Sequence, residues 1–160
     1  MVLEATLERM RQKIKLDIST DDVITPSAVE YEYKLMFENR TISLLTYNIE
    51  TLLAEKVQTI FARGISNTRF RDFYDVYRIV KMNTEKIDKD TLMEAFCATC
   101  EKRETIFSNE EMTNIFSKIK SNETMAQMWE KFREKNFFVG ELQWDEVLNS
   151  VLLTMDTYIL

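Results

Sequence analysis

Residues 46–80 read TYNIETLLAEKVQTIFARGISNTRFRDFYDVYRIV, and the spacing of their apolar side chains predicts two consecutive amphipathic helices. The first is expected over residues 48–63, where apolar positions recur every three or four residues and so share one helix face. Asn48 suits the N-cap of this helix, and Gly64 suits its end. The second is expected over residues 70–82, after the polar loop ISNTR. These helices are predicted to begin a helical lobe.

The rest of the chain predicts more helices downstream and a small β-containing piece upstream. Downstream, four helices are expected at about residues 88–104, 109–119, 122–135 and 143–158. Upstream, residues 2–12 predict a short helix, and KIKLDIS, residues 13–19, alternates as a strand does. The runs VEYEYKLMF and TISLLTY, separated by Glu38-Asn39-Arg40, predict a hairpin or two neighbouring strands. We therefore expect an α+β, predominantly helical fold, with about three strands in residues 1–46 and a helical lobe in residues 47–160.

The small sheet is predicted to be an incomplete unit. In the strand over residues 13–19, the apolar side chains Ile14, Leu16 and Ile18 face one way, so half of the strand should be buried. Three strands and one short helix bury too little apolar surface to be stable alone. Either the helical lobe or a partner chain is therefore expected to cover the sheet. An uncovered sheet would expose an apolar edge or face and favour self-association.

The composition excludes several classes of function. The 160-residue chain has a formal net charge of -6 and no His, which excludes Ser-His and Cys-His catalysis and His-ligated zinc. Its acidic balance argues against general nucleic-acid binding, although a local basic cluster is compatible with it. Its 2 Gly residues stand far apart, so this chain has no Gly-rich phosphate loop.

The cysteines and the hydropathy pattern bound the environment of the protein. Cys97 and Cys100 form a CxxC, which is half of a zinc site, a redox pair or two reduced thiols. A second pair of ligands is missing and the surrounding residues are helical in pattern, which favours reduced thiols with at least one in the core. The N-terminus has no apolar signal segment, and no stretch approaches the ~20 apolar residues of a membrane span. A cytoplasmic location without membrane contact is expected.

Charged residues on the two central helices are candidates for chemistry, and each has an ordinary structural interpretation as well. Lys56 lies at the edge of the apolar stripe, so it either snorkels and pairs with a carboxylate or points into a cleft. Asp72 and Asp75 are spaced i, i+3 on the second helix. They either hold a cation such as Mg²⁺ or lie on a solvated face, paired with Arg71 and Arg78.

A third carboxylate, Asp17, is expected on the polar face of the strand, beside Lys15. Carboxylates on strands at the edge of a sheet often hold the metal in phosphoryl transfer. A single strand Asp is also commonly a salt-bridge partner. The neighbouring residues in the sequence do not decide whether Asp17 is a metal ligand or a salt-bridge partner.

Taken together, these residues resemble the AbiEii abortive-infection toxin family of type IV toxin–antitoxin systems. Three motifs carry the resemblance, in the family's order and spacing: KLDIS at Lys15–Ser19, LLAEK at Leu52–Lys56 and NTRFRDFYD at Asn67–Asp75. They span roughly residues 11–80, about half of the chain. The helical tail is similar in kind but carries no recognisable motif.

The resemblance implies a nucleotidyltransferase fold, with a small mixed sheet and a helical C-terminal lobe. It also implies a nucleoside triphosphate with Mg²⁺, an antitoxin partner and, in some members, transfer of nucleotides onto tRNA acceptor ends. On this chain, Asp17 would lie near the metal and Lys56 would contact triphosphate oxygens. Asp72 and Asp75 would orient the nucleotide or the attacking hydroxyl. The phosphate-binding residues would be Lys15, Lys56 and Arg71.

The sequence departs from the family in its first motif. That motif is a Gly-Ser followed by Asp-x-Asp, which holds the metals and belongs upstream of KLDIS; the residues before Lys15 contain no Gly and no Asp. Asp21-Asp22 follow the strand and are no substitute. We therefore expect a truncated or incomplete nucleotidyltransferase toxin, inactive as an isolated chain. The alternative is a non-catalytic helical interaction protein that binds an antitoxin or another protein partner.

Overall fold

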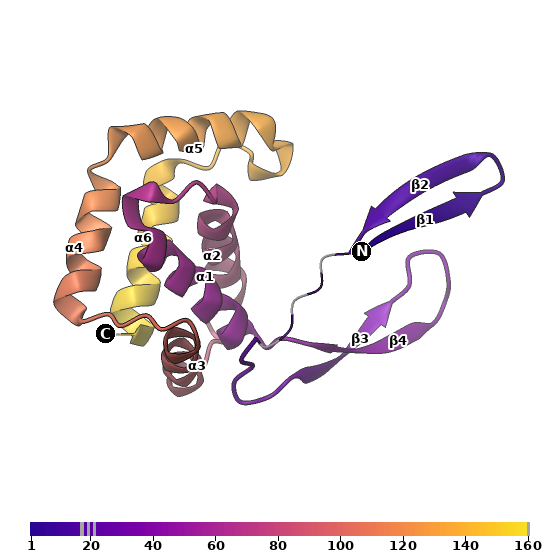
Figure 1. Ribbon diagram of the computed structural model, residues 1–160, viewed down its shortest axis with the longest axis horizontal. Helices are drawn as coiled ribbons and strands as arrows, with labels where there is room; N and C mark the ends of the chain where they lie inside the picture. The colour runs from indigo at the N-terminus through magenta and orange to yellow at the C-terminus, as the bar shows by residue number, and fades with distance from the viewer. Residues whose placement is uncertain (17, 19, 21, 160) are drawn as a thin grey trace.

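The computed structural model describes residues 1–16, 18, 20 and 22–159. Within this part of the chain, six α-helices form a lobe, and two β-hairpins lie together on one side of it (Figure 1). The α+β, predominantly helical fold expected from the sequence is therefore confirmed. The strands number four among the described residues, where about three were expected.

The first hairpin replaces the helix that was predicted over residues 2–12, and that prediction was wrong. Strand β1 is Val2–Leu7, and it pairs antiparallel with β2, Met10–Lys15. From Leu3 to Leu7 apolar and polar residues alternate with the period of two that is typical of a strand. Glu8 adopts a positive φ of 52° in the turn between the strands. Cross-strand pairing therefore prevails over the helical propensity of this segment.

The second hairpin confirms the prediction made for the two β-rich runs. Strand β3 is Val29–Lys34 and pairs antiparallel with β4, Thr41–Thr46, so that Tyr31 lies opposite Leu44. The expected turn residues fall between the two strands. β1–β2 and β3–β4 are separate two-stranded sheets in the described part of the chain.

The six helices match the sequence prediction closely. Their bounds are α1 Ile49–Arg63, α2 Phe70–Asn83, α3 Lys89–Lys102, α4 Asn109–Lys120, α5 Glu123–Lys135 and α6 Trp144–Thr154. Short turns follow three of them: η1 Gly64–Ser66, η2 Phe137–Val139 and the π-helical η3 Met155–Ile159. As predicted, Asn48 caps α1, its side chain accepting a hydrogen bond from the Thr51 amide at 2.9 Å. Gly64 follows the helix with a φ of 50°, which favours glycine.

The core of the lobe is built from buried side chains of all six helices. At its centre the aromatic rings of Phe70, Phe73, Trp129 and Trp144 pack against one another. The indole of Trp129 is fully buried and donates to the Leu142 carbonyl at 3.1 Å, so its polar atom is satisfied. This packing fixes α2 against α6 and thereby sets which face of α2 points outward.

The apolar faces of the hairpins are not covered by the lobe. The strand predicted over residues 13–19 corresponds to β2, Met10–Lys15, so Leu16 lies beyond its end. Ile14 is 42% exposed and Leu16 39%, so the half-burial predicted for this face was wrong. On the second hairpin Tyr31 and Leu44 are also exposed. Both hairpins project away from the helices (Figure 1). The expectation that the sheet piece exposes an apolar face is confirmed.

The cysteines are as predicted from their helical setting. Cys97 and Cys100 both lie on α3 as free thiols, with Cys97 exposed and Cys100 buried. Burial raises the pKa of the Cys100 thiol. Among the residues that the structure describes, no helix is long and apolar enough to cross a membrane.

Candidate functional site

The amine of Lys56 meets both carboxylates of the α2 pair. Its Nζ lies 2.8 Å from Asp72 Oδ1 and 3.0 Å from Asp75 Oδ2. The i, i+3 spacing puts the two acids on one side of α2, and the packing of α1 on α2 turns Lys56 toward them. The acid partner that was one predicted alternative for Lys56 is therefore present.

Each of the two carboxylates faces a second cation. Arg69 Nε lies 2.9 Å from Asp72 Oδ2, and Arg71 Nε lies 3.2 Å from Asp75 Oδ1. The side chain of Asp72 is 1% exposed, so its charge depends on these partners. Asn67 positions Arg69, because its buried side chain accepts a hydrogen bond from the Arg69 amide at 2.8 Å.

The two acids keep Lys56 charged. Burial lowers the pKa of Lys56, but its hydrogen bonds to Asp72 and Asp75, together with their negative charge, outweigh that effect and raise the pKa above the usual lysine value. The amine is therefore a fixed positive charge at neutral pH. A charged amine beside a cleft is suited to bind an anion.

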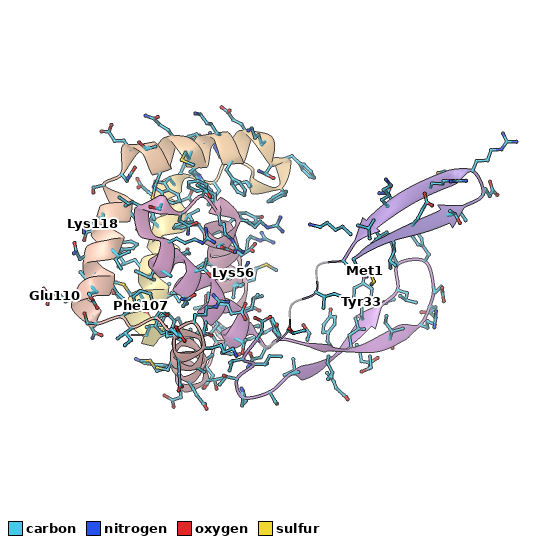
Figure 2. The ribbon with its side chains drawn as sticks, viewed as in Figure 1. Met1, Tyr33, Lys56, Phe107, Glu110 and Lys118 are labelled. Carbon is cyan, nitrogen blue, oxygen red and sulfur yellow. The ribbon has the colours of Figure 1, made fainter. Side chains whose placement is uncertain are left out.

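A cavity of about 440 Å³ opens beside this cluster. Its charged lining residues are four cations, Lys56, Arg63, Arg69 and Arg103, and two acids, Glu55 and Asp72. These residues form a local basic cluster, which is compatible with the acidic net charge of the chain. Lys56 is labelled on α1 in Figure 2, while Lys118 lies on α4 at the outer side of the lobe.

Arg63, Arg69 and Arg103 line this cavity and were not among the predicted site residues, and of the three Arg103 lies farthest from the motifs in the sequence. It follows α3, and its Nη1 donates to Gln58 Oε1 at 2.6 Å and to Thr59 Oγ1 at 3.0 Å on α1. Burial raises the pKa of the Glu55 carboxyl, and the nearby Arg103 opposes this shift. A cation near a helix C-terminus is common, so nothing in the sequence distinguishes Arg103.

The remaining candidates lie elsewhere or are not described. Asp17, the expected metal-holding acid, lies outside the described residues. Its neighbour Lys15 is on β2, on the hairpin that projects from the lobe, and does not line the cavity. Arg71 joins the cluster through Asp75, as expected. Arg78, the other predicted partner, has no ion pair to either acid in the described part of the chain.

The described residues of the cluster suit an anion better than a metal ion. Outside residues 17, 19, 21 and 160, no group of three or more Asp, Glu, Cys or His side chains lies close enough to hold a metal. Asp72 and Asp75 each already face two cations. A divalent cation would have to displace these partners, so we assign no step to a metal here.

Comparison with known proteins identifies the family. The model of the family described as "Nucleotidyl transferase AbiEii toxin, Type IV TA system" matches residues 1–150. Comparisons with curated proteins and with solved structures gave no match. The family match covers the hairpins, the Lys56 cluster and most of the helical tail. The chain therefore belongs to the AbiEii family of nucleotidyl transferase toxins of type IV toxin–antitoxin systems.

Proposed function

We propose that the helical lobe binds the phosphates of a nucleoside triphosphate at the cavity beside Lys56. The observation that carries this proposal is the convergence of Lys56 with the Asp72–Asp75 pair at the edge of a cationic cavity. A chain with a net charge of -6 gathers four cations there, which favours an anionic ligand.

The individual roles follow from the contacts. Lys56 contacts the triphosphate as a compact point charge, and the acids hold its amine in place until the phosphate arrives. Asp75 is 25% exposed at its side chain, so it is the acid better placed to orient the nucleotide or an attacking hydroxyl. Arg71 does not line the cavity, but through its ion pair with Asp75 it adds positive charge next to the Lys56 cluster. Lys15 and Asp17 keep the roles that the family implies, phosphate binding and metal holding.

We further propose that this chain binds triphosphate with its Mg²⁺ without transferring nucleotide by itself. No Gly-Ser or Asp-x-Asp precedes Lys15 in the printed sequence. The two parts then have separate tasks, with residues 1–46 belonging to the catalytic sheet and residues 47–160 to substrate binding. In a complete site the acceptor would be a tRNA end, and an antitoxin would be the functional partner.

A binding measurement tests the phosphate site. Titration calorimetry with GTP, with and without Mg²⁺, should show binding to the unchanged protein, and Lys56→Met should weaken it roughly 10- to 100-fold, since hydrogen bonds to charged groups contribute about 1.5–3 kcal/mol. Lys118→Met is the matched control, because Lys118 is an exposed lysine on α4. Equal affinity of all three proteins, or no binding of GTP or any other triphosphate, would contradict the proposal.

A transfer assay tests the second part. Radiolabelled nucleoside triphosphates incubated with total tRNA and this chain should yield no labelled RNA above the level of Lys56→Met. Labelling that depends on Lys56 would show that the chain is active alone and overturn the proposed inactivity.

A second candidate function is a non-catalytic protein-binding module. The exposed apolar faces of the two hairpins, with Tyr31 56% and Leu44 45% exposed, favour it. The two functions are separable, because substitutions on the hairpins should impair protein association and leave triphosphate binding intact.

A further inference from the structure

A second cavity lies on the other flank of α2, between that helix and the η2 turn. Its volume is about 350 Å³, and three aromatic side chains line it: Tyr74, Tyr77 and Phe138. The rings of Tyr74 and Phe138 meet edge to face at 5.3 Å, and the Tyr74 hydroxyl donates to the Phe138 carbonyl at 3.1 Å. The turn is thus fastened to α2 beside the cavity. Its charged lining residues are Arg78, Glu141 and Glu146.

Arg71 connects this aromatic cavity to the Lys56 cluster. Its guanidinium carbon lies 5.0 Å from the centre of the Phe138 ring, and its Nε lies 3.2 Å from Asp75 Oδ1. Asp75 in turn contacts Lys56. Contacts of Arg71 with Phe138 and with Asp75 therefore link a residue that lines the aromatic cavity to the Lys56 cluster, along the exposed side of α2. A single extended ligand that runs along this side of α2 reaches both.

The two cavities suit different parts of one nucleotide. One offers fixed positive charges, which bind phosphate. The other offers aromatic walls with a few polar groups, which suit a flat, partly polar ring. Nucleobases stack on aromatic side chains and on the planar guanidinium of Arg. The Tyr74–Phe138 contact by itself is ordinary packing between α2 and η2. It is Arg71, in contact with both Phe138 and Asp75, that connects this cavity to the Lys56 cluster.

We propose that the cavity between α2 and η2 receives an unpaired nucleobase whose attached phosphate lies against Arg71 and Lys56. This inference rests on the proposed triphosphate site and adds a neighbouring site for the nucleobase. The base stacks on the wall formed by Tyr74 and Phe138, and Arg71 bridges base and phosphate. The base belongs to the nucleoside triphosphate itself or to a single-stranded RNA.

Phe138→Leu tests the proposal, because it removes the ring and keeps apolar bulk. The probes are inorganic tripolyphosphate and the triphosphate of 2-aminopurine riboside, whose fluorescence changes when the base stacks. Phe138→Leu should weaken the nucleotide roughly 5- to 100-fold, as loss of one stacking contact does. Its affinity for tripolyphosphate should not change. Phe137→Leu is the matched control, since Phe137 is the adjacent residue, is 95% exposed and does not line the cavity.

The outcomes separate this inference from the phosphate site. Two results would overturn the proposed base site and leave the phosphate site standing. One is equal affinity of the unchanged protein for tripolyphosphate and for the nucleotide. The other is equal affinity of Phe138→Leu and Phe137→Leu for the nucleotide. If neither ligand binds, both proposals are overturned. A tetranucleotide containing 2-aminopurine distinguishes the sources: if stacking that depends on Phe138 occurs with it and not with the mononucleotide, the base comes from RNA.

Discussion

At the scale of single residues, the buried carboxylate of Asp72 controls the cluster. Its side chain is 1% exposed, and its charge is balanced by Lys56 and Arg69. A buried ion pair adds little stability compared with an apolar pair of the same shape, but removal of one partner leaves an uncompensated charge. Function and stability are therefore coupled at Lys56, so binding assays need variants whose folding is measured separately.

Replacement of Lys56 should destabilise the protein through Asp72. We expect Lys56→Met to lower the free energy of unfolding by about 2–4 kcal/mol, less than a completely unpaired charge because Arg69 remains. Urea denaturation followed by circular dichroism measures the change. Lys118→Met, at an exposed position, should stay within about 0.5 kcal/mol of the unchanged protein. A loss of similar size in both variants would contradict the role of Asp72.

The raised pKa of Lys56 predicts a pH dependence on the alkaline side. A lysine whose pKa rises on folding contributes stability that is complete below the ordinary lysine value of 10.5 and is lost as pH rises through the folded-state pKa. The difference in free energy of unfolding between the unchanged protein and Lys56→Met should therefore be constant from pH 7 to 9 and shrink above about pH 10.5. A difference that grows with pH would contradict this sign.

At the scale of elements, helices α1, α3, α4 and α5 each begin with an N-cap side chain that accepts a hydrogen bond from an amide of the first turn. Helix α4 begins with a capping box, in which the Ser108 hydroxyl accepts from the Glu111 amide at 3.2 Å and the Ser108 amide donates to the Glu111 carboxylate at 2.8 Å. These contacts satisfy amides that have no partner within the helix. They also hold the Glu111 carboxyl at a pKa below its ordinary value.

Loss of this cap should weaken α4 by a measurable amount. Ser108→Ala is expected to lower the free energy of unfolding by about 1 kcal/mol, since one amide at the helix start loses its acceptor. Ser117→Ala on the same helix is the control, because Ser117 is exposed and its hydroxyl only donates to the Thr113 carbonyl. Thermal or urea unfolding of the two variants should separate them, and equal stabilities would contradict the cap.

The hairpins differ from the helices, since each has one apolar face and one charged face. On β1–β2 the charged face includes Arg11 and Lys13, and on β3–β4 it includes Glu30 and Glu32. The apolar faces remain exposed to solvent. A two-stranded sheet by itself buries too little apolar surface to compensate for the free-energy cost of this exposure.

At the scale of the whole molecule, the uncovered hairpins predict self-association. In sedimentation velocity the unchanged protein should have a weight-average mass above the 19.0 kDa of one chain, and that mass should increase with concentration. Leu44→Glu places a charge on the apolar face and should shift the mass toward one chain. Ser43→Glu, on the opposite face of the same strand, should not. A single-chain mass for the unchanged protein at all concentrations would contradict the prediction.

The sequence by itself determined the helical lobe and half of the candidate site. Helix positions follow from apolar periodicity, Asn48 and Gly64, which are local signals. The Lys56–Asp72–Asp75 group was predictable because Lys56 lies in one family motif and both acids lie in another. The i, i+3 spacing that puts the two acids on one side of α2 is a local property of a single helix.

Only the tertiary structure decided the rest. Arg103 reaches the cavity across more than forty residues of sequence, and the cavity at Phe138 forms where η2 packs on α2. Residues 2–12 became a hairpin because the pairing of β1 with β2 outweighed local propensity. The physical reason is common to all three: helix formation depends on neighbours along the chain, whereas strand pairing and cavity lining depend on residues brought together by packing.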